Sequence, residues 1–186
     1  MSGHQDQDSS ILKVAINLTI ACFLSGLIIG SVWYFTAEAA SEKQILIRNE
    51  AMQRLMPDAD EFVPVDSDEK VFKAMDKGQT IALLVPASRP GYEAAVVLLV
   101  AVSMDGTVID YEITAQSETP GLGDKGGLEP FRKQFWGKKA DQLEVVKNAP
   151  DTPYINAMAG ATITTKAITN AVKDALADAE EYLRGE

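Results

Sequence analysis

The chain has 186 residues and a formal net charge of −10 at pH 7, a length that suits one membrane segment plus one compact domain and excludes two large domains. A surface this acidic repels nucleic-acid phosphates, so nucleic acid is not an expected partner. The single cysteine, Cys22, excludes an internal disulfide, a thiolate-ligated iron–sulfur cluster and a CxxC redox pair within the chain, and the single histidine, His4, predicts no metal site. Any redox role therefore requires a bound cofactor.

An apolar segment follows a polar N-terminal tail, residues 1–10. The run from Val14 to Phe35 carries no charge, and its length of roughly 33 Å is enough to cross a hydrocarbon core of about 30 Å. The sequence therefore predicts a transmembrane helix over residues 11–36.

A cleavable signal peptide is the alternative, because Ala37–Ala39 offers a small-residue cleavage site. The apolar run is too long for that alternative, and Lys13 is the one basic residue before it, so an uncleaved anchor is expected. Three basic residues lie shortly after the span, Lys43, Arg48 and Arg54. Counted literally, the positive-inside rule places the large domain inside the cell.

A stalk helix is predicted for residues 37–56, because good helix formers continue up to Pro57. The remaining residues, 57–186, form the predicted domain. It opens with two strand-like stretches, residues 61–65 and, after the Lys77-Gly78 break, residues 80–87.

An antiparallel hairpin follows. Residues 92–103 are apolar without alternation, which predicts a strand covered on both faces, and Asp105-Gly106 supplies the turn. The return strand, residues 107–117, alternates. The alternation predicts two faces, one with Ile109, Tyr111, Ile113 and Ala115 and the other with Asp110, Glu112 and Thr114.

The loop over residues 117–127 reads SETPGLGDKGG. Its Pro-Gly pair suits a tight turn, and its four glycines are free to adopt positive φ. Such a loop can bring backbone amides close to a flat or anionic ligand, although a surface loop without a ligand is the alternative. A short helix, residues 129–137, then places Phe131, Phe135 and Trp136 on one side, which predicts core positions, with a cofactor stack as the alternative. The strand-like LEVVK, residues 143–147, precedes the last motif.

The final segment is predicted to be an amphipathic helix packed on the sheet. Its apolar positions recur at intervals of three and four: Ile163, Ala167, Ile168, Ala171, Val172, Ala175, Leu176, Ala179 and Leu183. The first turn of such a helix favours an anion. Threonines gather there, at Thr162, Thr164 and Thr165. The alternative is that one of them only caps the helix, which is a common role for threonine.

Two motifs resemble a known family. The segment ETPGLG, residues 118–123, is followed by GATIT, residues 160–164, in a chain with one N-terminal span. Residues 11–186 resemble the FMN-binding G subunit of the Rnf electron transport complex, and are similar to the C subunit of the sodium-translocating NADH:quinone reductase. With the elements above, the resemblance implies an α+β fold, in which a transmembrane helix precedes an FMN-binding domain with a largely antiparallel sheet and packed helices.

The resemblance implies where the cofactor is held. In this family a flavin transferase that uses FAD joins FMN, through its phosphate, to the last threonine of a Ser/Thr-Gly-Ala-Thr motif, which is Thr162 here. The other implied cofactor contacts are Gly160, Ala161, Thr164 and Thr165 beside it, and Glu118, Thr119, Pro120, Gly121, Leu122 and Gly123 in the loop. The chain has Asn156 and Ala159 where the motif has Asp and a hydroxyl residue, and Gln116-Ser117 where a histidine is often found.

The implied function is electron carriage by a membrane-anchored subunit of an ion-translocating ferredoxin:NAD oxidoreductase, with no catalytic side chain and no metal site. The implied partners are the other subunits of the complex, the flavin transferase and the cytoplasmic (inner) membrane. The resemblance places the FMN domain on the periplasmic or extracytoplasmic side, against the literal count of basic residues. A quinone-reductase subunit is one alternative, and a non-redox membrane-anchored interaction domain is the other.

Overall fold

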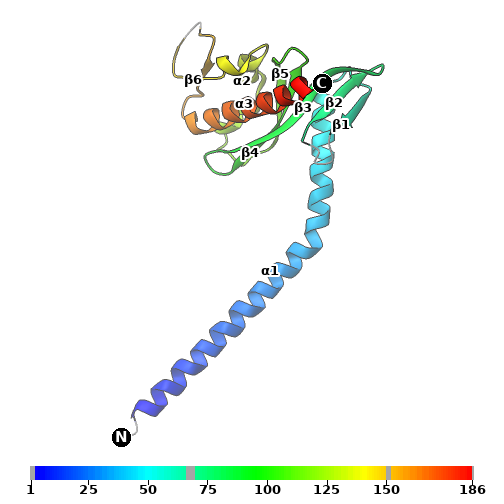
Figure 1. Ribbon diagram of the computed structural model, residues 1–186. Coiled ribbons are helices and arrows are strands. Elements are labelled where there is room, and N and C mark those ends of the chain that lie inside the picture. The colour runs from blue at the N-terminus through cyan, green and yellow to red at the C-terminus, as the bar shows by residue number, and fades with distance from the viewer. Residues whose placement is uncertain (1–2, 66–69, 150–151, 186) are drawn as a thin grey trace. The chain divides into compact units, whose positions relative to one another are not determined.

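The computed structural model describes residues 3–65, 70–149 and 152–185 (Figure 1), so residues 1–2 of the predicted tail lie outside the described residues. The chain divides into two compact units after Leu46. The described residues of the first unit all belong to helix α1 (Gly3–Leu55), and the last turns of this helix, from Ile47 on, belong to the second unit. Its stretch Ile11–Ala37 is long and apolar enough to cross a membrane, by length and composition.

The second unit is built on a five-stranded antiparallel sheet whose strands are neighbours in chain order. The strands are β1 (Glu61–Pro64), β2 (Phe72–Asp76), β3 (Gln79–Pro90), β4 (Ala95–Ser103) and β5 (Val108–Ala115). The predicted hairpin is confirmed as β4 and β5, with Gly106 at φ 77° in its turn. Strand β2 is not predicted by the sequence pattern. The Lys77-Gly78 pair, predicted as a break, is the two-residue turn between β2 and β3, with φ of 50° and 79°.

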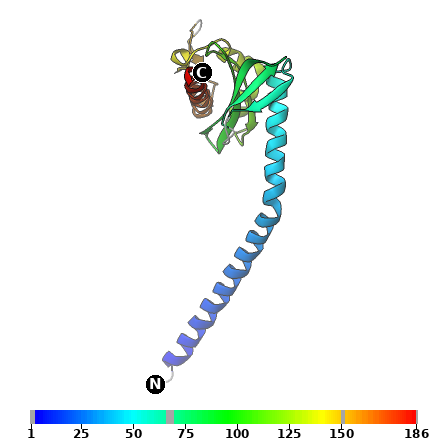
Figure 2. The ribbon, with the colours of Figure 1, turned by 45° about the vertical axis from the view of Figure 1, so that its right-hand side comes forward.

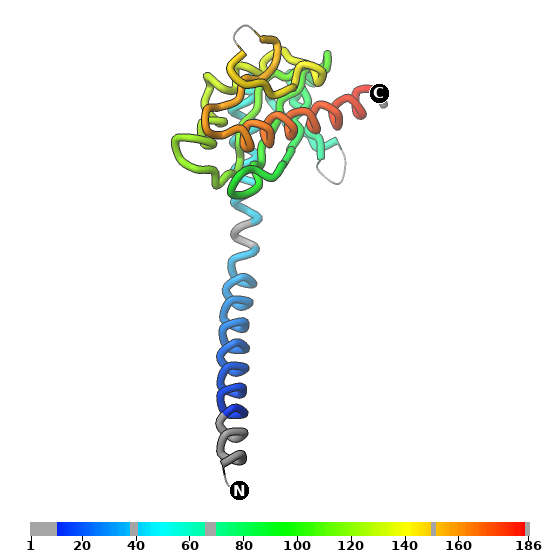
Figure 3. The backbone as a smooth tube through the Cα atoms, turned by 90° about the vertical axis from the view of Figure 1, so that its left-hand side faces the viewer, coloured from blue at the N-terminus to red at the C-terminus, as the bar shows by residue number. Residues whose placement is uncertain are grey.

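Both faces of the sheet are covered. The C-terminal helix α3 (Thr162–Gly185) packs on one face, where Leu98 of β4 belongs to the same core cluster as Ile168 and Leu176 (Figure 2). Figure 3 shows α3 crossing in front of the strands. The end of α1 packs on the other face, with Met52 in a second cluster that includes Leu99. The prediction that the first hairpin strand is buried on both faces is therefore confirmed.

The two-face pattern predicted for β5 is wrong at Ile109 and at Ala115. Tyr111 and Ile113 face the cluster beneath α3, as expected, but Ile109 packs against the cluster beneath α1. The cause is a shift of register at each end of the strand: Ala101 pairs with Asp110 while Val102 pairs with Val108, and Leu98 pairs with Ile113 while Val97 pairs with Ala115. One extra residue in a strand reverses the face of every side chain beyond it.

Short elements connect β5 to α3: η1 (Gly123–Gly127), α2 (Glu129–Arg132), η2 (Lys133–Phe135), η3 (Ala140–Gln142), β6 (Val145–Val146) and β7 (Ile155–Asn156). Strands β6 and β7 form a short parallel pair, so the predicted strand in LEVVK is confirmed.

The expected aromatic cluster is correct for two of its members. Phe131 and Phe135 are buried, and the Phe135 ring meets the Tyr111 ring edge to face with 5.1 Å between centroids. Trp136 is 44% exposed, so its predicted place in the core is wrong. Its ring lies outside because η2 ends at Phe135 and the chain turns at Gly137, which has a φ of 69°.

Candidate functional site

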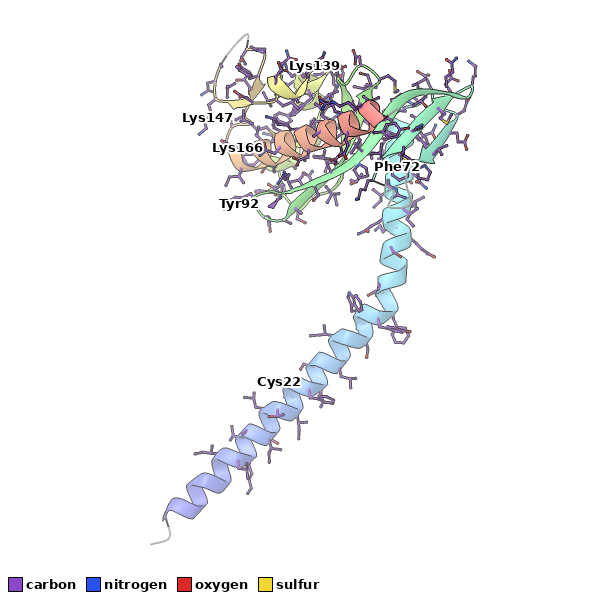
Figure 4. The ribbon with its side chains drawn as sticks, viewed as in Figure 1. Cys22, Phe72, Tyr92, Lys139, Lys147 and Lys166 are labelled. Atoms are coloured by element: carbon purple, nitrogen blue, oxygen red, sulfur yellow. The ribbon has the colours of Figure 1, made fainter. Side chains whose placement is uncertain are left out.

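A cavity of about 460 Å³ opens where three segments of the second unit meet. The segments are the turn between β3 and β4, the loop before η1 and the first turn of α3. Figure 4 places Tyr92, from that turn, near the beginning of α3, where Lys166 is also labelled. The cavity is lined by Tyr92, Glu118, Thr119, Leu122, Gly123, Gly160, Ala161, Thr162, Ile163 and Thr164.

The structure thus brings together most of the residues that the two motifs predicted. The exceptions are Pro120 and Gly121, which form the exposed part of a turn, and Thr165, which is buried beneath the cavity. Tyr92 is a lining residue that the sequence did not reveal, because its position resembles the beginning of a strand. Ile163 is another, since it is 54% exposed at the cavity although its spacing predicted a place in the core.

The predicted tight turn is present in the loop. The Leu122 N–H donates to the Thr119 carbonyl over 3.1 Å, and Gly121 has a φ of 77°. Proline followed by a glycine with positive φ is the preferred central pair of a type II turn. The other glycines of the loop do not have positive φ. Gly123 is required for space, since a Cβ there would lie 2.8 Å from Thr164 Oγ1 and 2.9 Å from Glu118 Cβ.

Glu118 is a buried carboxylate that connects all three segments. Its Oε1 accepts hydrogen bonds from the Tyr92 N–H over 2.9 Å and the Glu93 N–H over 3.2 Å, and its Oε2 accepts one from the Thr164 hydroxyl. Burial raises the pKa of Glu118, but the Thr164 hydroxyl and the backbone N–H groups of the turn stabilise the charged form more. The net pKa lies below its ordinary value, so the group is ionised at neutral pH.

The three threonines of the first turn differ in what their hydroxyls contact. Thr164 donates to Glu118, while Thr165 Oγ1 donates to the Ala161 carbonyl over 2.9 Å and accepts from the Met158 N–H over 3.1 Å. Both side chains are buried. Thr162 is half-buried at the cavity, and no hydrogen bond to its hydroxyl is found within the described parts of the chain.

None of these threonines is the N-cap. The first helical hydrogen bond runs from the Thr165 N–H to the Ala161 carbonyl, so Ala161, which has no polar side chain, occupies the cap position. The alternative interpretation of a capping threonine is therefore wrong. The N–H groups of Thr162, Ile163 and Thr164 lack an intrahelical acceptor, as at every helix beginning, and they carry the positive end of the helix dipole.

Asn156 does not line the cavity. Its side chain accepts from the Ala149 N–H and donates to the Ala149 carbonyl, both over 3.0 Å, and its own N–H donates to the Gln134 side chain. An aspartate could accept but not donate in this pair, so asparagine is the better partner for both backbone groups of Ala149. Among the residues that the structure describes, no group of three or more His, Cys, Asp or Glu side chains could hold a metal ion.

Two solved structures share the fold. The chain is 26% identical to the C subunit of the Na⁺-translocating NADH-quinone reductase from Parabacteroides distasonis, with a TM-score of 0.51 over 61% of each chain. It also matches NqrC of Shewanella oneidensis, with 22% identity and a TM-score of 0.52 over 62% of this chain and 61% of that one.

The sequence comparisons include a relative that matches the whole chain. Residues 91–177 match the family of the FMN-binding domain. The chain is 46% identical to the G subunit of the proton-translocating ferredoxin:NAD⁺ oxidoreductase complex of Clostridium ljungdahlii, over 100% of both chains. It is 32% identical to the G subunit of the ion-translocating oxidoreductase complex of Pseudomonas aeruginosa, over 90% of this chain and 87% of that one. The chain therefore belongs to the G subunits of the Rnf ion-translocating ferredoxin:NAD⁺ oxidoreductase complexes, which carry an FMN-binding domain.

Proposed function

We propose that this protein carries electrons through an FMN that is joined by its phosphate to the Thr162 hydroxyl. FMN, when bound, supplies one- and two-electron chemistry, while the protein positions it and adjusts its potential. The other subunits of the Rnf complex are then the electron donor and acceptor, and no side chain of this chain acts as a catalyst.

The cavity fits the cofactor. Its volume of about 460 Å³ lies within the range of small-molecule and cofactor sites. The first turn of α3 lines the cavity, and the N–H groups at the beginning of a helix suit a phosphate group. Gly160, with a φ of 76°, leaves space beside that turn, because a Cβ there would lie 3.1 Å from Leu122 Cδ2.

One observation carries the choice of attachment residue. Thr164 and Thr165 already use their hydroxyls in buried hydrogen bonds, whereas the Thr162 hydroxyl lies at the cavity and has no such bond within the described residues. Attachment would form one ester bond between Thr162 Oγ1 and the phosphorus of the FMN half of FAD. It would break the phosphoanhydride bond of FAD and release AMP and the hydroxyl proton. The flavin transferase would catalyse this reaction.

Denaturing electrophoresis tests the proposal. The full chain, co-expressed with a flavin transferase, is expected to retain flavin fluorescence on the gel. Thr162→Ala should abolish the signal and Thr162→Ser should keep it, because serine retains the hydroxyl. Thr164→Val is the matched control and should remain fluorescent. An unsubstituted chain without fluorescence would refute covalent attachment, and a fluorescent Thr162→Ala chain would refute the site.

We also propose that α1 anchors the chain in the cytoplasmic membrane, with the second unit on the periplasmic or extracytoplasmic side. The literal count of basic residues favours the opposite side, but large domains translocate largely regardless of such charges. Protease added to intact spheroplasts should then digest residues 57–186. Complete protection of these residues until the spheroplasts are lysed would refute the proposed orientation and place them on the cytoplasmic side.

A further inference from the structure

Tyr92 is an exposed aromatic side chain on a rigid turn. Its side chain is 70% exposed, and it lines the cavity. The turn that carries it is closed by a hydrogen bond of 2.8 Å from the Gly91 N–H to the Ala94 carbonyl. An aromatic ring that a fixed backbone holds at the mouth of a cavity is well placed to contact a ligand.

The buried Glu118 carboxylate holds this turn in place. The same carboxylate accepts the N–H groups of Tyr92 and Glu93 and the hydroxyl of Thr164, so it ties the turn to the first turn of α3. The turn packs tightly against the carboxylate, since a Cβ at Gly91 would overlap Glu118 Oε1 and lie 2.7 Å from the Ala94 carbonyl oxygen.

The lining of the cavity has both apolar and polar parts. Tyr92, Leu122 and Ile163 provide exposed apolar surface, with Leu122 40% and Ile163 54% exposed. Thr162 and the N–H groups of the first turn of α3 provide the polar part. A ligand that combines a flat ring system with a phosphate group matches this mixed lining.

We propose that Tyr92 packs against the isoalloxazine ring of the flavin, and that Glu118 is the positioning residue that holds Tyr92 there. This inference rests on the proposed function, and it concerns the ring rather than the point of attachment. Glu118 acts through the turn and through Thr164, whereas Tyr92 touches the ring itself.

Flavin fluorescence of the purified full chain tests the contact. A tyrosine ring in contact with a flavin quenches its fluorescence by donating an electron to the excited ring. Tyr92→Phe and Tyr92→Leu should therefore both raise the fluorescence per flavin, and the visible circular dichroism should change more for leucine, which cannot stack. The matched control is Tyr154, which is 37% exposed and does not line the cavity. Tyr154→Leu should leave both signals unchanged.

A double-mutant comparison tests the positioning role. Glu118→Ala should raise the fluorescence per flavin as Tyr92→Leu does, and the double variant Tyr92→Leu/Glu118→Ala should be no brighter than Tyr92→Leu alone. Glu118→Gln should resemble the unsubstituted chain, because the amide can accept from the turn and donate to Thr164 Oγ1. Additive increases in the double variant would overturn the positioning role.

The outcomes separate this inference from the proposed function. Chains that carry no flavin after denaturation refute the proposed function. If the chains carry flavin but Tyr92→Phe and Tyr92→Leu are as dim as the unsubstituted chain, the ring contact is refuted and the proposed function is not. The Tyr92 variants alter an exposed side chain, so they give this answer even where Glu118→Ala fails to fold.

Discussion

Replacing Gly123 with alanine should force apart the hydrogen bond between Glu118 and Thr164. The added Cβ would lie 2.8 Å from Thr164 Oγ1, 2.9 Å from Glu118 Cβ and 2.9 Å from Glu118 Oε2. Real Cβ atoms do not approach other atoms this closely, so the two side chains would have to shift and give up their buried hydrogen bond. Overpacking of this kind costs about 1–3 kcal/mol.

Thermal unfolding of the detergent-solubilised full chain, followed by far-ultraviolet circular dichroism, measures this cost. For a unit of this size, about 1–3 kcal/mol corresponds to a fall in Tm of roughly 3–12 °C. Gly127→Ala is the matched control in the same short helix, because its Cβ would meet only Ile113 Cδ1, at 3.8 Å. Its free energy of unfolding should change by about 0.5 kcal/mol or less. Equal Tm values for the two variants would refute the reasoning.

Three further comparisons test other parts of the unit. Arg132→Met should cost about 1–3 kcal/mol in urea unfolding, because it removes the guanidinium from the partly buried Asp110 and leaves Glu112 with its ion pair to Arg54. Arg184→Met, which breaks an exposed pair, should cost about 0.5 kcal/mol or less. Phe135→Ala should cost about 3–5 kcal/mol by emptying a fully buried site, and Trp136→Ala about 1 kcal/mol or less, so similar losses would contradict the core assignment. The pKa of Glu118 is lower in the folded than in the unfolded chain. Ionised Glu118 therefore stabilises the folded chain above about pH 4.5, and this stabilisation is lost as the pH falls through the folded pKa. Glu118→Gln should therefore show a smaller fall in Tm on acidification than the unsubstituted chain, and parallel curves would contradict this.

Much of the sheet could be predicted because its pattern is local. The continuous apolar sequence of β4 indicates burial on both faces, and Asp105-Gly106 indicates the turn that follows. The bulge at Ile109 could not be predicted, because the alternation around it continues as in a regular strand. The strand β2 was missed for a similar reason: the sequence marks the Lys77-Gly78 turn, but a five-residue strand before it gives too short a pattern to recognise.

The sequence predicted the two segments of the site but not the contacts that join them. The glycine loop and the beginning of α3 each have a local signature, and the family resemblance joins them. The contacts of Glu118 have no such signature, because its partners lie 26 residues earlier in the chain, at Tyr92, and 46 residues later, at Thr164. Residues so far apart come together only through the order of the strands. The contact between Glu118 and the turn at Tyr92 could therefore be found only in the structure.

The same long-range contacts bear on how one hydroxyl is chosen for the proposed attachment. In the sequence the three threonines of the first turn are chemically alike. In the fold, Thr165 would have to give up a hydrogen bond of about 0.5–1.5 kcal/mol to react, and Thr164 one to a charged acceptor of about 1.5–3 kcal/mol. Thr162 gives up none within the described residues and already lies at the cavity. The hydrogen bonds of its neighbours therefore support Thr162 as the proposed attachment residue, independently of any motif that a transferase recognises.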